Sequence, residues 1–148
     1  MLQSLSPIKK AYIAGFLDGD GSIYARAKPN PTYKYGFQVA PYIVLYQSQT
    51  SQEKFAEVCK LIGVGHLRVR SDGILKYIIE RADDIKMLLK CVTPFVILKR
   101  KQVMLMKQIL QQKHKIEKES DFEALLKMVD SFRELNYSKK RKIRTLTP

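Results

Sequence analysis

Two carboxylates stand close together early in the chain, in the segment Asp18-Gly19-Asp20-Gly21. Carboxylate oxygens are ligands that Mg²⁺ and Ca²⁺ prefer, so this segment is a candidate metal site. An EF-hand loop, the common alternative, needs glycine at its sixth position and an acid at its twelfth. Counting from Asp18, these positions hold Ile23 and Pro29. On the residues alone, a metal site built on Asp20 and a simple helix end with two solvated acids both stay open.

A helix is predicted directly before these acids. Ser6-Pro7 is typical of a helix start, with Ser6 as the N-cap and proline at the first helical position. We expect this helix to run from Pro7 to about Asp18 and to end at the glycines. Residues 11–17 are all apolar or glycine, so the helix has no polar face and must be covered on every side. We therefore expect it to contact its own core and a second body.

Strand patterns follow the acids. Residues 22–28 alternate between apolar and polar, and residues 36–47 return as a second strand, which predicts a hairpin with one polar, basic face. In the second strand we expect Phe37, Val39, Ile43 and Leu45 on one face and Gln38, Ala40, Tyr42, Val44 and Tyr46 on the other. Pro41 indicates an edge position or a bulge in the second strand. A second hairpin is predicted over residues 66–80, with its turn at Ser71-Asp72-Gly73.

Helices are predicted between and after the two hairpins. Capping boxes at Thr50-x-x-Glu53 and Ser120-x-x-Glu123 predict two of them, and the others cover residues 83–92 and 96–112. The order helix, hairpin, helix, hairpin, helices predicts an α+β fold, an antiparallel sheet with helices packed on one face. A chain of 148 residues without a linker suits a single domain, residues 1–148.

The composition indicates a polyanionic partner. The net charge is +13, which favours nucleic acid over an uncommitted basic surface. Two cysteines, Cys59 and Cys91, form neither a disulfide framework nor a zinc motif and suit an intracellular location. We expect no membrane association, since the chain has neither an 18-residue apolar run nor a signal-peptide pattern.

Residues 13–21, IAGFLDGDG, resemble the LAGLIDADG motif, with five of nine positions identical. The spacing from this motif to Gln47, to residues 62–65, to Pro94-Phe95 and to Lys99 resembles the single-motif LAGLIDADG homing endonucleases of algal organelles. The resemblance implies a saddle-shaped sheet and an intron-encoded, site-specific enzyme. It would hydrolyse one phosphodiester in each strand of a long, near-palindromic DNA site and leave short 3′ overhangs. It also implies a chloroplast or mitochondrial location in an alga, with the cytoplasm as the alternative.

The same resemblance implies the catalytic residues Asp20, Gln47 and Lys99. Asp20 would bridge Mg²⁺ ions with the Gly19 carbonyl beside it, and Mn²⁺ or Ca²⁺ could substitute for binding. Gln47 would position water, and Lys99 would lie near the nucleophile. Ser51 departs from relatives that place a basic residue there.

Cutting both strands requires two such acids, and the chain has one motif, so the resemblance implies a C2 homodimer. The residues expected in its interface are Ala11, Tyr12, Ala14, Gly15, Leu17 and Asp18.

The polar sheet face resembles the DNA-reading saddle of the family. For each side chain, contact with a base and contact with a phosphate are open alternatives. The basic end, residues 137–148, could stay flexible until DNA is bound. The expected DNA contacts are Arg26, Lys28, Asn30, Thr32, Tyr33, Gln38, Ala40, Val44, Arg68, Arg70, Lys76, Ile78, Ser138, Lys139, Lys140 and Lys142.

A catalytically inactive relative, such as an intron RNA maturase or a DNA-binding regulator, is the alternative function. Such proteins usually lose the motif acids, whereas Asp20 and Gln47 are both present here. A structural ribosomal or chromatin protein would explain the charge but not the acids at the end of an apolar helix. No small-molecule substrate is expected.

Overall fold

The computed structural model describes residues 2–136. The elements are η1 (Leu2–Ser4), α1 (Pro7–Asp20), β1 (Gly21–Pro29), β2 (Phe37–Ser48), η2 (Gln49–Ser51), α2 (Gln52–Ile62), β3 (His66–Val69), β4 (Ile74–Ile79), α3 (Ala82–Val92), α4 (Arg100–Gln112), η3 (Lys113–Lys115) and α5 (Glu119–Leu135). None of the helices within this range is long and apolar enough to cross a membrane.

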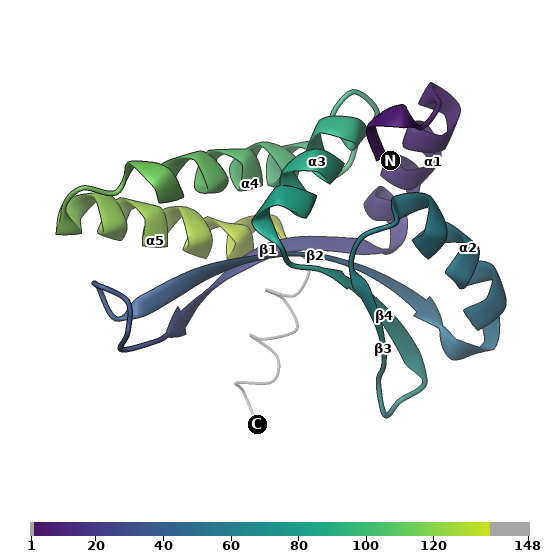
Figure 1. The fold of residues 1–148 in the computed structure, drawn as a ribbon, viewed down its shortest axis with the longest axis horizontal. Coiled ribbons are helices and arrows are strands. Elements are labelled where there is room, and N and C mark those ends of the chain that lie inside the picture. The colour runs from purple at the N-terminus through teal and green to yellow at the C-terminus, as the bar shows by residue number, and fades with distance from the viewer. Residues whose placement is uncertain (1, 137–148) are drawn as a thin grey trace.

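The four strands form one antiparallel sheet in the order β1-β2-β4-β3. The sheet is curved, and the α-helices lie on its convex side, so the predicted α+β architecture is confirmed (Figure 1). β2 is an interior strand, but β4 pairs with it only from Ile43 onward. Pro41 therefore has a strand partner, Ala25 of β1, on one side only, as the proline predicted for an edge position.

The other side of the sheet, which no described helix covers, is called the concave face below (Figure 1). Strand pairing places on it Ser22, Tyr24, Arg26, Lys28, Gln38, Ala40, Tyr42, Val44, Tyr46, His66, Arg68, Lys76 and Ile78.

Helix α1 begins as the sequence predicts. The Ser6 side chain accepts a hydrogen bond from the Lys9 N–H, and Pro7 is the first helical residue. The helix ends two residues later than expected, at Asp20, where the Gly21 N–H bonds to the Leu17 carbonyl. A Cβ at Gly21 would lie 2.6 Å from a Leu17 methyl and 2.7 Å from its carbonyl oxygen. Glycine at this position lets β1 start immediately after Asp20.

One side of α1 is part of the hydrophobic core. Ile13, Ala14 and Leu17 are 0–1% exposed and pack among residues of the sheet and the other helices. Ala14 and Leu17 were expected in a subunit interface, and this expectation is wrong. Their side chains are buried in the chain's own core, so they have no surface left for a partner.

Three helix starts differ from the sequence predictions. Ser51 precedes α2 without a side-chain cap, and the 3-10 turn η2 occupies the place of the expected Thr50 cap. At α5 the capping acid is Asp121, which accepts the Glu117 and Lys118 N–H groups, so the helix begins at Glu119. α4 begins at Arg100 rather than near residue 96, because the Asp18 carboxylate binds the backbone N–H groups of residues 97–99.

Candidate active site and nucleic-acid interface

Asp20 lies at the junction of α1 and β1. It ends α1, directly precedes β1, and is exposed to solvent. Within residues 2–136, no hydrogen bond or ion pair engages its carboxylate. The carboxylate is therefore available for a cation or a substrate.

Asp18 has a different role from Asp20. Its Oδ2 accepts hydrogen bonds from the N–H groups of Ile97 at 2.8 Å and Leu98 at 3.1 Å, and its Oδ1 accepts one from Lys99 at 3.0 Å. These amides lead into α4, so Asp18 caps that helix from another part of the chain. The carboxylate also faces the positive end of the α4 dipole. Asp18 is half-buried and both of its carboxylate oxygens bond within the chain, so its place in a subunit interface stays a prediction.

The same contact brings Lys99 to the acid segment. Its ammonium group donates a hydrogen bond to the Asp18 carbonyl at 2.9 Å, two residues before Asp20. Gln47 approaches by strand register, since it lies two residues beyond Leu45, the partner of Gly21. Its Oε1 accepts the Ser48 N–H at 3.0 Å.

The contacts therefore bring Lys99 to the end of α1, and strand register places Gln47 two residues beyond the partner of Gly21. Within the described residues, no hydrogen bond joins the side chains of Asp20, Gln47 and Lys99 to one another.

The oxygen donors at this junction fit a hard divalent cation. Asp20 offers a free carboxylate, and Gly19 before it is exposed, with space beside it where a Cβ would meet no other part of the described chain within 4 Å. No group of three or more His, Cys, Asp or Glu side chains within residues 2–136 could hold a metal alone. A cation here would need further oxygens from a second subunit, a phosphate or water, as Mg²⁺ commonly does.

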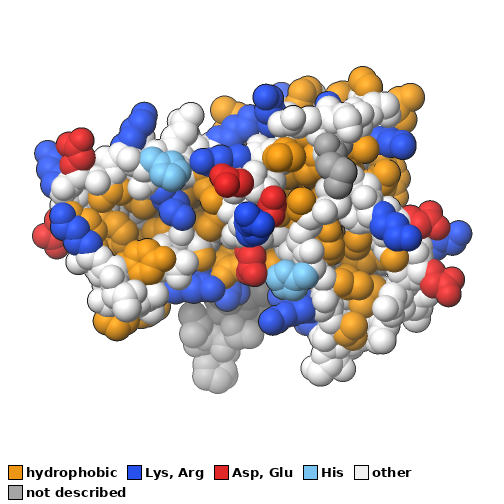
Figure 2. Space-filling view, viewed as in Figure 1, with side chains coloured by type: hydrophobic (Ala, Val, Ile, Leu, Met, Phe, Trp, Pro, Cys, Tyr) orange, Lys and Arg blue, Asp and Glu red, His pale blue; other side chains and the backbone are white. Residues whose placement is uncertain are grey.

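An exposed stripe runs along the outer side of α1. Ile8, Tyr12, Gly15 and Gly19 follow at helical spacing and are all exposed, with Ile8 at 83% and Tyr12 at 53%. Ala11, beside this stripe, is exposed as well. Figure 2 shows apolar side chains at the surface of the region around α1. Three of the expected interface residues, Ala11, Tyr12 and Gly15, are thus free for contact.

Two apolar side chains near the other end of this stripe were missed by the sequence reasoning. Ile97 and Leu98 are 75% and 74% exposed, and Asp18 holds their backbone at the end of α1. Ile8 was missed as well. A signal for Ile8 was present, because it is four residues before Tyr12 and seven before Gly15 on one helix face.

The concave face is basic. Arg26, Lys28 and Arg68 are exposed, and Lys76 is half-buried opposite Arg68. Gln38, also half-buried, is opposite Lys28. Figure 2 shows Lys and Arg side chains along the lower edge of the molecule, where this face begins. These five expected DNA contacts thus share one surface that also borders Asp20.

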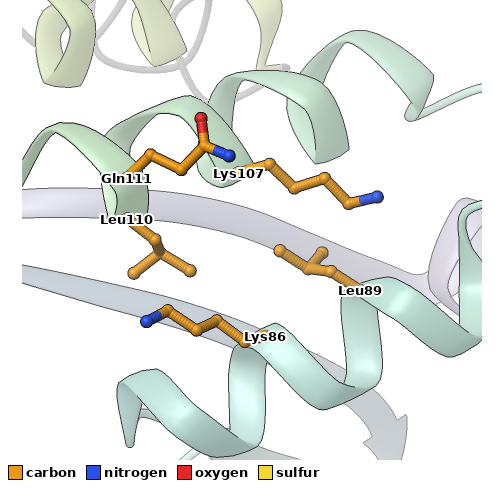
Figure 3. Close-up of a pocket in the computed structure, with 5 residues that line it drawn as sticks. All are labelled: Lys86, Leu89, Lys107, Leu110 and Gln111. Carbon is orange, nitrogen blue, oxygen red and sulfur yellow. The ribbon is translucent and has the colours of Figure 1, made fainter.

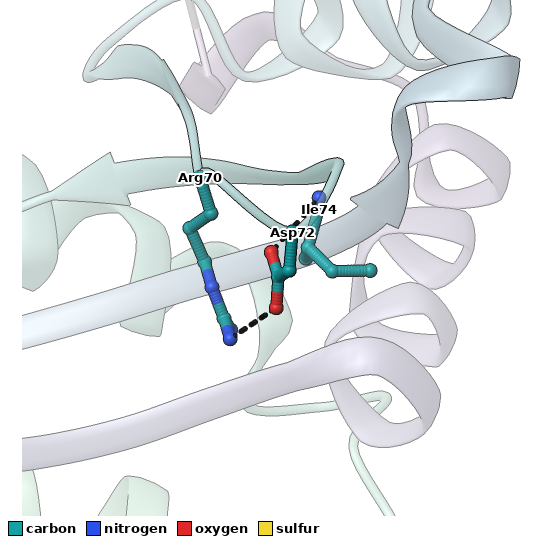
Figure 4. A network of polar contacts seen from close by, with 3 residues as sticks. All are labelled: Arg70, Asp72 and Ile74. Atoms are coloured by element: carbon teal, nitrogen blue, oxygen red, sulfur yellow. Dashed lines mark hydrogen bonds and ion pairs between the residues drawn. The ribbon is translucent and has the colours of Figure 1, made fainter.

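Arg70 is engaged within the chain. Its guanidinium lies 2.6 Å from Asp72 Oδ2, while Asp72 Oδ1 accepts the Ile74 N–H at 3.2 Å (Figure 4). Gly73, with a φ of 81°, completes the predicted turn. Arg70 is about half exposed and can reach a phosphate only by exchanging this ion pair.

The tip of the first hairpin holds three further expected DNA contacts. Asn30 Oδ1 accepts hydrogen bonds from the Thr32 N–H at 3.0 Å and the Thr32 hydroxyl at 2.7 Å, which shapes the turn. Tyr33 is 46% exposed. Ser138, Lys139, Lys140 and Lys142 lie outside the described residues.

Three apolar residues expected to contact bases are covered instead. Val44 is 0% exposed, and Ala40 and Ile78 are each 8% exposed. Together with Tyr42 they form a small cluster against which Tyr24 and Tyr46 pack. The alternating pattern gave their face of the sheet correctly, but it did not show that tyrosines from the same face close over them. Val44 has no surface left for a base.

A pocket of about 180 Å³ opens between α3 and α4 (Figure 3). None of the residues predicted for the site lines it, and its walls are Lys86, Leu89, Lys107, Leu110 and Gln111. Nearby, burial and the charge of Lys86 lower the pKa of Lys113.

The chain is similar to known endonucleases in sequence. A family model described as LAGLIDADG endonuclease matches residues 13–109. The DNA endonuclease I-CreI of Chlamydomonas reinhardtii is 35% identical over 132 residues, which are 88% of this chain and 80% of that protein. The DNA endonuclease I-CvuI of Chlorella vulgaris is 30% identical over 105 residues, 71% of this chain and 65% of that protein.

Solved structures show the same fold. The homing endonuclease I-CvuI, in complex with the I-CreI target, has a TM-score of 0.81 at 27% identity, covering 88% of this chain and 83% of that one. The homing endonuclease I-TnaI has a TM-score of 0.77 at 22% identity, covering 95% and 97%, and it supports the fold alone. The matched family model includes Asp18, Asp20 and Lys99, so the geometry and the comparisons agree that this chain belongs to the LAGLIDADG endonuclease family.

Proposed function

We infer that this chain is a site-specific DNA endonuclease of the homing type, which hydrolyses one phosphodiester in each strand of a double-stranded site. One observation carries this function: a free, exposed carboxylate, Asp20, lies between the exposed stripe of α1 and the basic concave face. A carboxylate in the path of a polyanion is electrostatically unfavourable unless a cation accompanies it. The arrangement suits metal-assisted phosphodiester hydrolysis.

Each chain supplies one such acid, so we propose a C2 homodimer with the α1 stripe at its axis. Gly15 and Gly19 present no side chain there, which would allow two copies of α1 to approach closely. Tyr12, Ile97 and Leu98 would supply the apolar contact area.

Sedimentation of the free protein tests the dimer. The wild type should sediment as a dimer, and Leu98→Glu should shift it to a monomer, since a charge would be buried at the axis. Val69→Glu is the matched control, because Val69 is 54% exposed on β3, outside the proposed interface. A wild-type monomer, or equal effects of the two variants, would contradict this interface.

The proposed cofactor is Mg²⁺, held by Asp20 with the Gly19 carbonyl beside it; Mn²⁺ or Ca²⁺ would substitute for binding. When bound, a divalent cation activates water and stabilises negative charge on the leaving 3′ oxygen. The Gln47 amide would orient the attacking water by hydrogen bonding. The Lys99 ammonium group, fixed at the Asp18 carbonyl, would stabilise the charge that develops on the phosphate.

The proposed DNA contacts are the exposed polar side chains of the concave face and of the β1–β2 hairpin tip. Arg and Lys suit guanine O6 and N7, whereas Asn and Gln suit adenine. A dimer would present this face twice, so the site would be near-palindromic.

A selection from randomised DNA tests this function directly. The protein is incubated with the library and Mg²⁺, and cleaved molecules are sequenced. We expect enrichment of one long, near-palindromic sequence with a cut in each strand. Uncut DNA, together with retention of intron RNA in preference to any DNA site, would favour the inactive, RNA-binding alternative.

The whole chain, residues 1–148, is proposed to act as one endonuclease domain. Because the relatives named above come from Chlamydomonas reinhardtii and Chlorella vulgaris, we also propose an intracellular location, in the chloroplast or mitochondrion of an alga.

A further inference from the structure

The β1–β2 part of the concave face holds a pair of stacked tyrosines. Tyr24 of β1 and Tyr42 of β2 are direct partners across the two strands. Their ring centroids are 5.1 Å apart, and the ring planes are inclined by 21°. Tyr42 is 7% exposed and Tyr24 is half-buried, so the pair is fixed by the cluster beneath it. The two rings thus form a rigid aromatic platform, the Tyr24–Tyr42 platform.

The side chain of Arg26 lies over both rings. Its Cζ is 5.4 Å from the Tyr24 ring centroid and 5.6 Å from the Tyr42 ring centroid, within the range of a cation–π contact. Burial raises the pKa of Tyr24, and the positive charge of Arg26 lowers it by a smaller amount. The phenol therefore stays neutral near pH 7. Within residues 2–136 no carboxylate forms an ion pair with Arg26. The tyrosine rings are what holds this guanidinium.

The tyrosine rings contact the flat face of the Arg26 guanidinium, so its N–H groups, which point outward in the guanidinium plane, stay free to donate. Those donors match guanine O6 and N7, which accept two parallel hydrogen bonds in the major groove. Ordering a flexible side chain on binding normally weakens association, and a preformed position avoids this cost. Lys28, whose Nζ is 5.2 Å from the Tyr42 ring centroid, has a similar contact but lacks the fork geometry.

We propose that the Tyr24–Tyr42 platform positions Arg26 to read a guanine about six base pairs from the scissile phosphate in each half-site. The location follows from the strand: Arg26 is six residues beyond Asp20, roughly 20 Å at about 3.3 Å per residue. At about 3.4 Å per nucleotide this span corresponds to roughly six base pairs. The inference rests on the proposed function. Arg26 is the specificity-determining residue, and the two tyrosines are positioning residues.

The test measures base preference in binding, without cleavage. Asp20→Asn protein is equilibrated with DNA in which one half-site position at a time is varied, and bound and free pools are sequenced. Arg26→Lys keeps the charge and removes the fork. Tyr42→Leu removes a ring, Tyr42→Phe keeps it, and Tyr24→Leu repeats the test at a less buried position in case Tyr42→Leu does not fold.

We expect a guanine preference near the sixth base pair. It should fall on the order of tenfold in Arg26→Lys and about fivefold in Tyr42→Leu or Tyr24→Leu, with preferences at other positions unchanged. Tyr42→Phe should stay within about twofold of the parent.

The inference is overturned if Arg26→Lys retains the guanine preference. It is also overturned if both leucine variants weaken binding equally for all four bases, which is the result of a purely structural role. Failure of the proposed function is seen separately, in the cleavage selection, where the wild-type protein would then leave all DNA uncut.

Discussion

Asp18 is predicted to stabilise the fold rather than to take part in chemistry. Asp18→Ala removes an acceptor of three backbone hydrogen bonds at 2.8, 3.1 and 3.0 Å. Loss of an ordinary N-cap side chain costs about 1 kcal/mol. Bonds to a charged acceptor are stronger, at about 1.5–3 kcal/mol each, but this site is partly exposed and water replaces part of them. We therefore expect the free energy of unfolding to fall by about 2–3 kcal/mol.

Thermal and urea unfolding, followed by circular dichroism at one fixed protein concentration, measure this effect. For a domain of this size the expected loss lowers Tm by about 5–10 °C. Asp18→Asn keeps one acceptor oxygen and should lose about half as much. Asp20→Ala is the matched control two residues away, and its exposed side chain predicts a change within about 0.5 kcal/mol. If Asp18→Ala is no less stable than Asp20→Ala, the capping role is refuted.

Four further outcomes are expected. Gly21→Ala should lower both stability and cleavage, because its methyl group would collide with the Leu17 backbone; unchanged cleavage in a nuclease assay would contradict the close packing. Asp72→Asn keeps an acceptor for the turn and releases Arg70, so affinity in fluorescence anisotropy should rise about two- to fivefold, whereas a loss would show that the ion pair assists binding. DNA affinity should fall steeply with salt concentration. If five basic side chains per subunit contact phosphates, a plot of log binding constant against log salt concentration should have a slope no steeper than about −9. A flat response would exclude the concave face as the DNA-binding surface. Burial raises the pKa of the Cys59 thiol to about 11, so alkylation by iodoacetamide at pH 8 should be on the order of 100-fold slower in the native protein than in urea, and equal rates would contradict this.

Local patterns predicted the elements well where nearby residues decide them. The Ser6-Pro7 start of α1 and the β1–β2 hairpin depend on neighbours within a few positions, and both are confirmed. The capping boxes expected at Thr50 and Ser120 are wrong, because other groups nearby in the sequence take their place. An adjacent 3-10 turn and the acid Asp121 offered competing partners for the same backbone groups.

The role of Asp18 could not be predicted, since the amides that it binds are 79–81 residues further along the chain. Sequence spacing showed two similar acids at one helix end. The fold separates them, giving Asp18 three partners and leaving Asp20 free.

Only some of the residues expected at contact surfaces are exposed, again because distant parts of the chain decide burial. Periodicity assigns a side chain to a face of a helix or sheet, but burial depends on what packs over it. Ala14 and Leu17 belong to the core side of α1, and Val44 is covered by tyrosines of the concave face. The exposed Ile97 and Leu98 lie before α4, where no periodic pattern marks them.

The central claim is that Asp20 is the catalytic, metal-binding acid, and one paired measurement tests it most directly. Linearisation of a supercoiled plasmid carrying the selected site is followed with Mg²⁺ for wild-type and Asp20→Asn protein at saturating concentration, and the Kd for the same site is measured. We expect the rate to fall by a factor on the order of 10³ or more, with Kd within about twofold. Cleavage by Asp20→Asn at the wild-type rate would contradict the account.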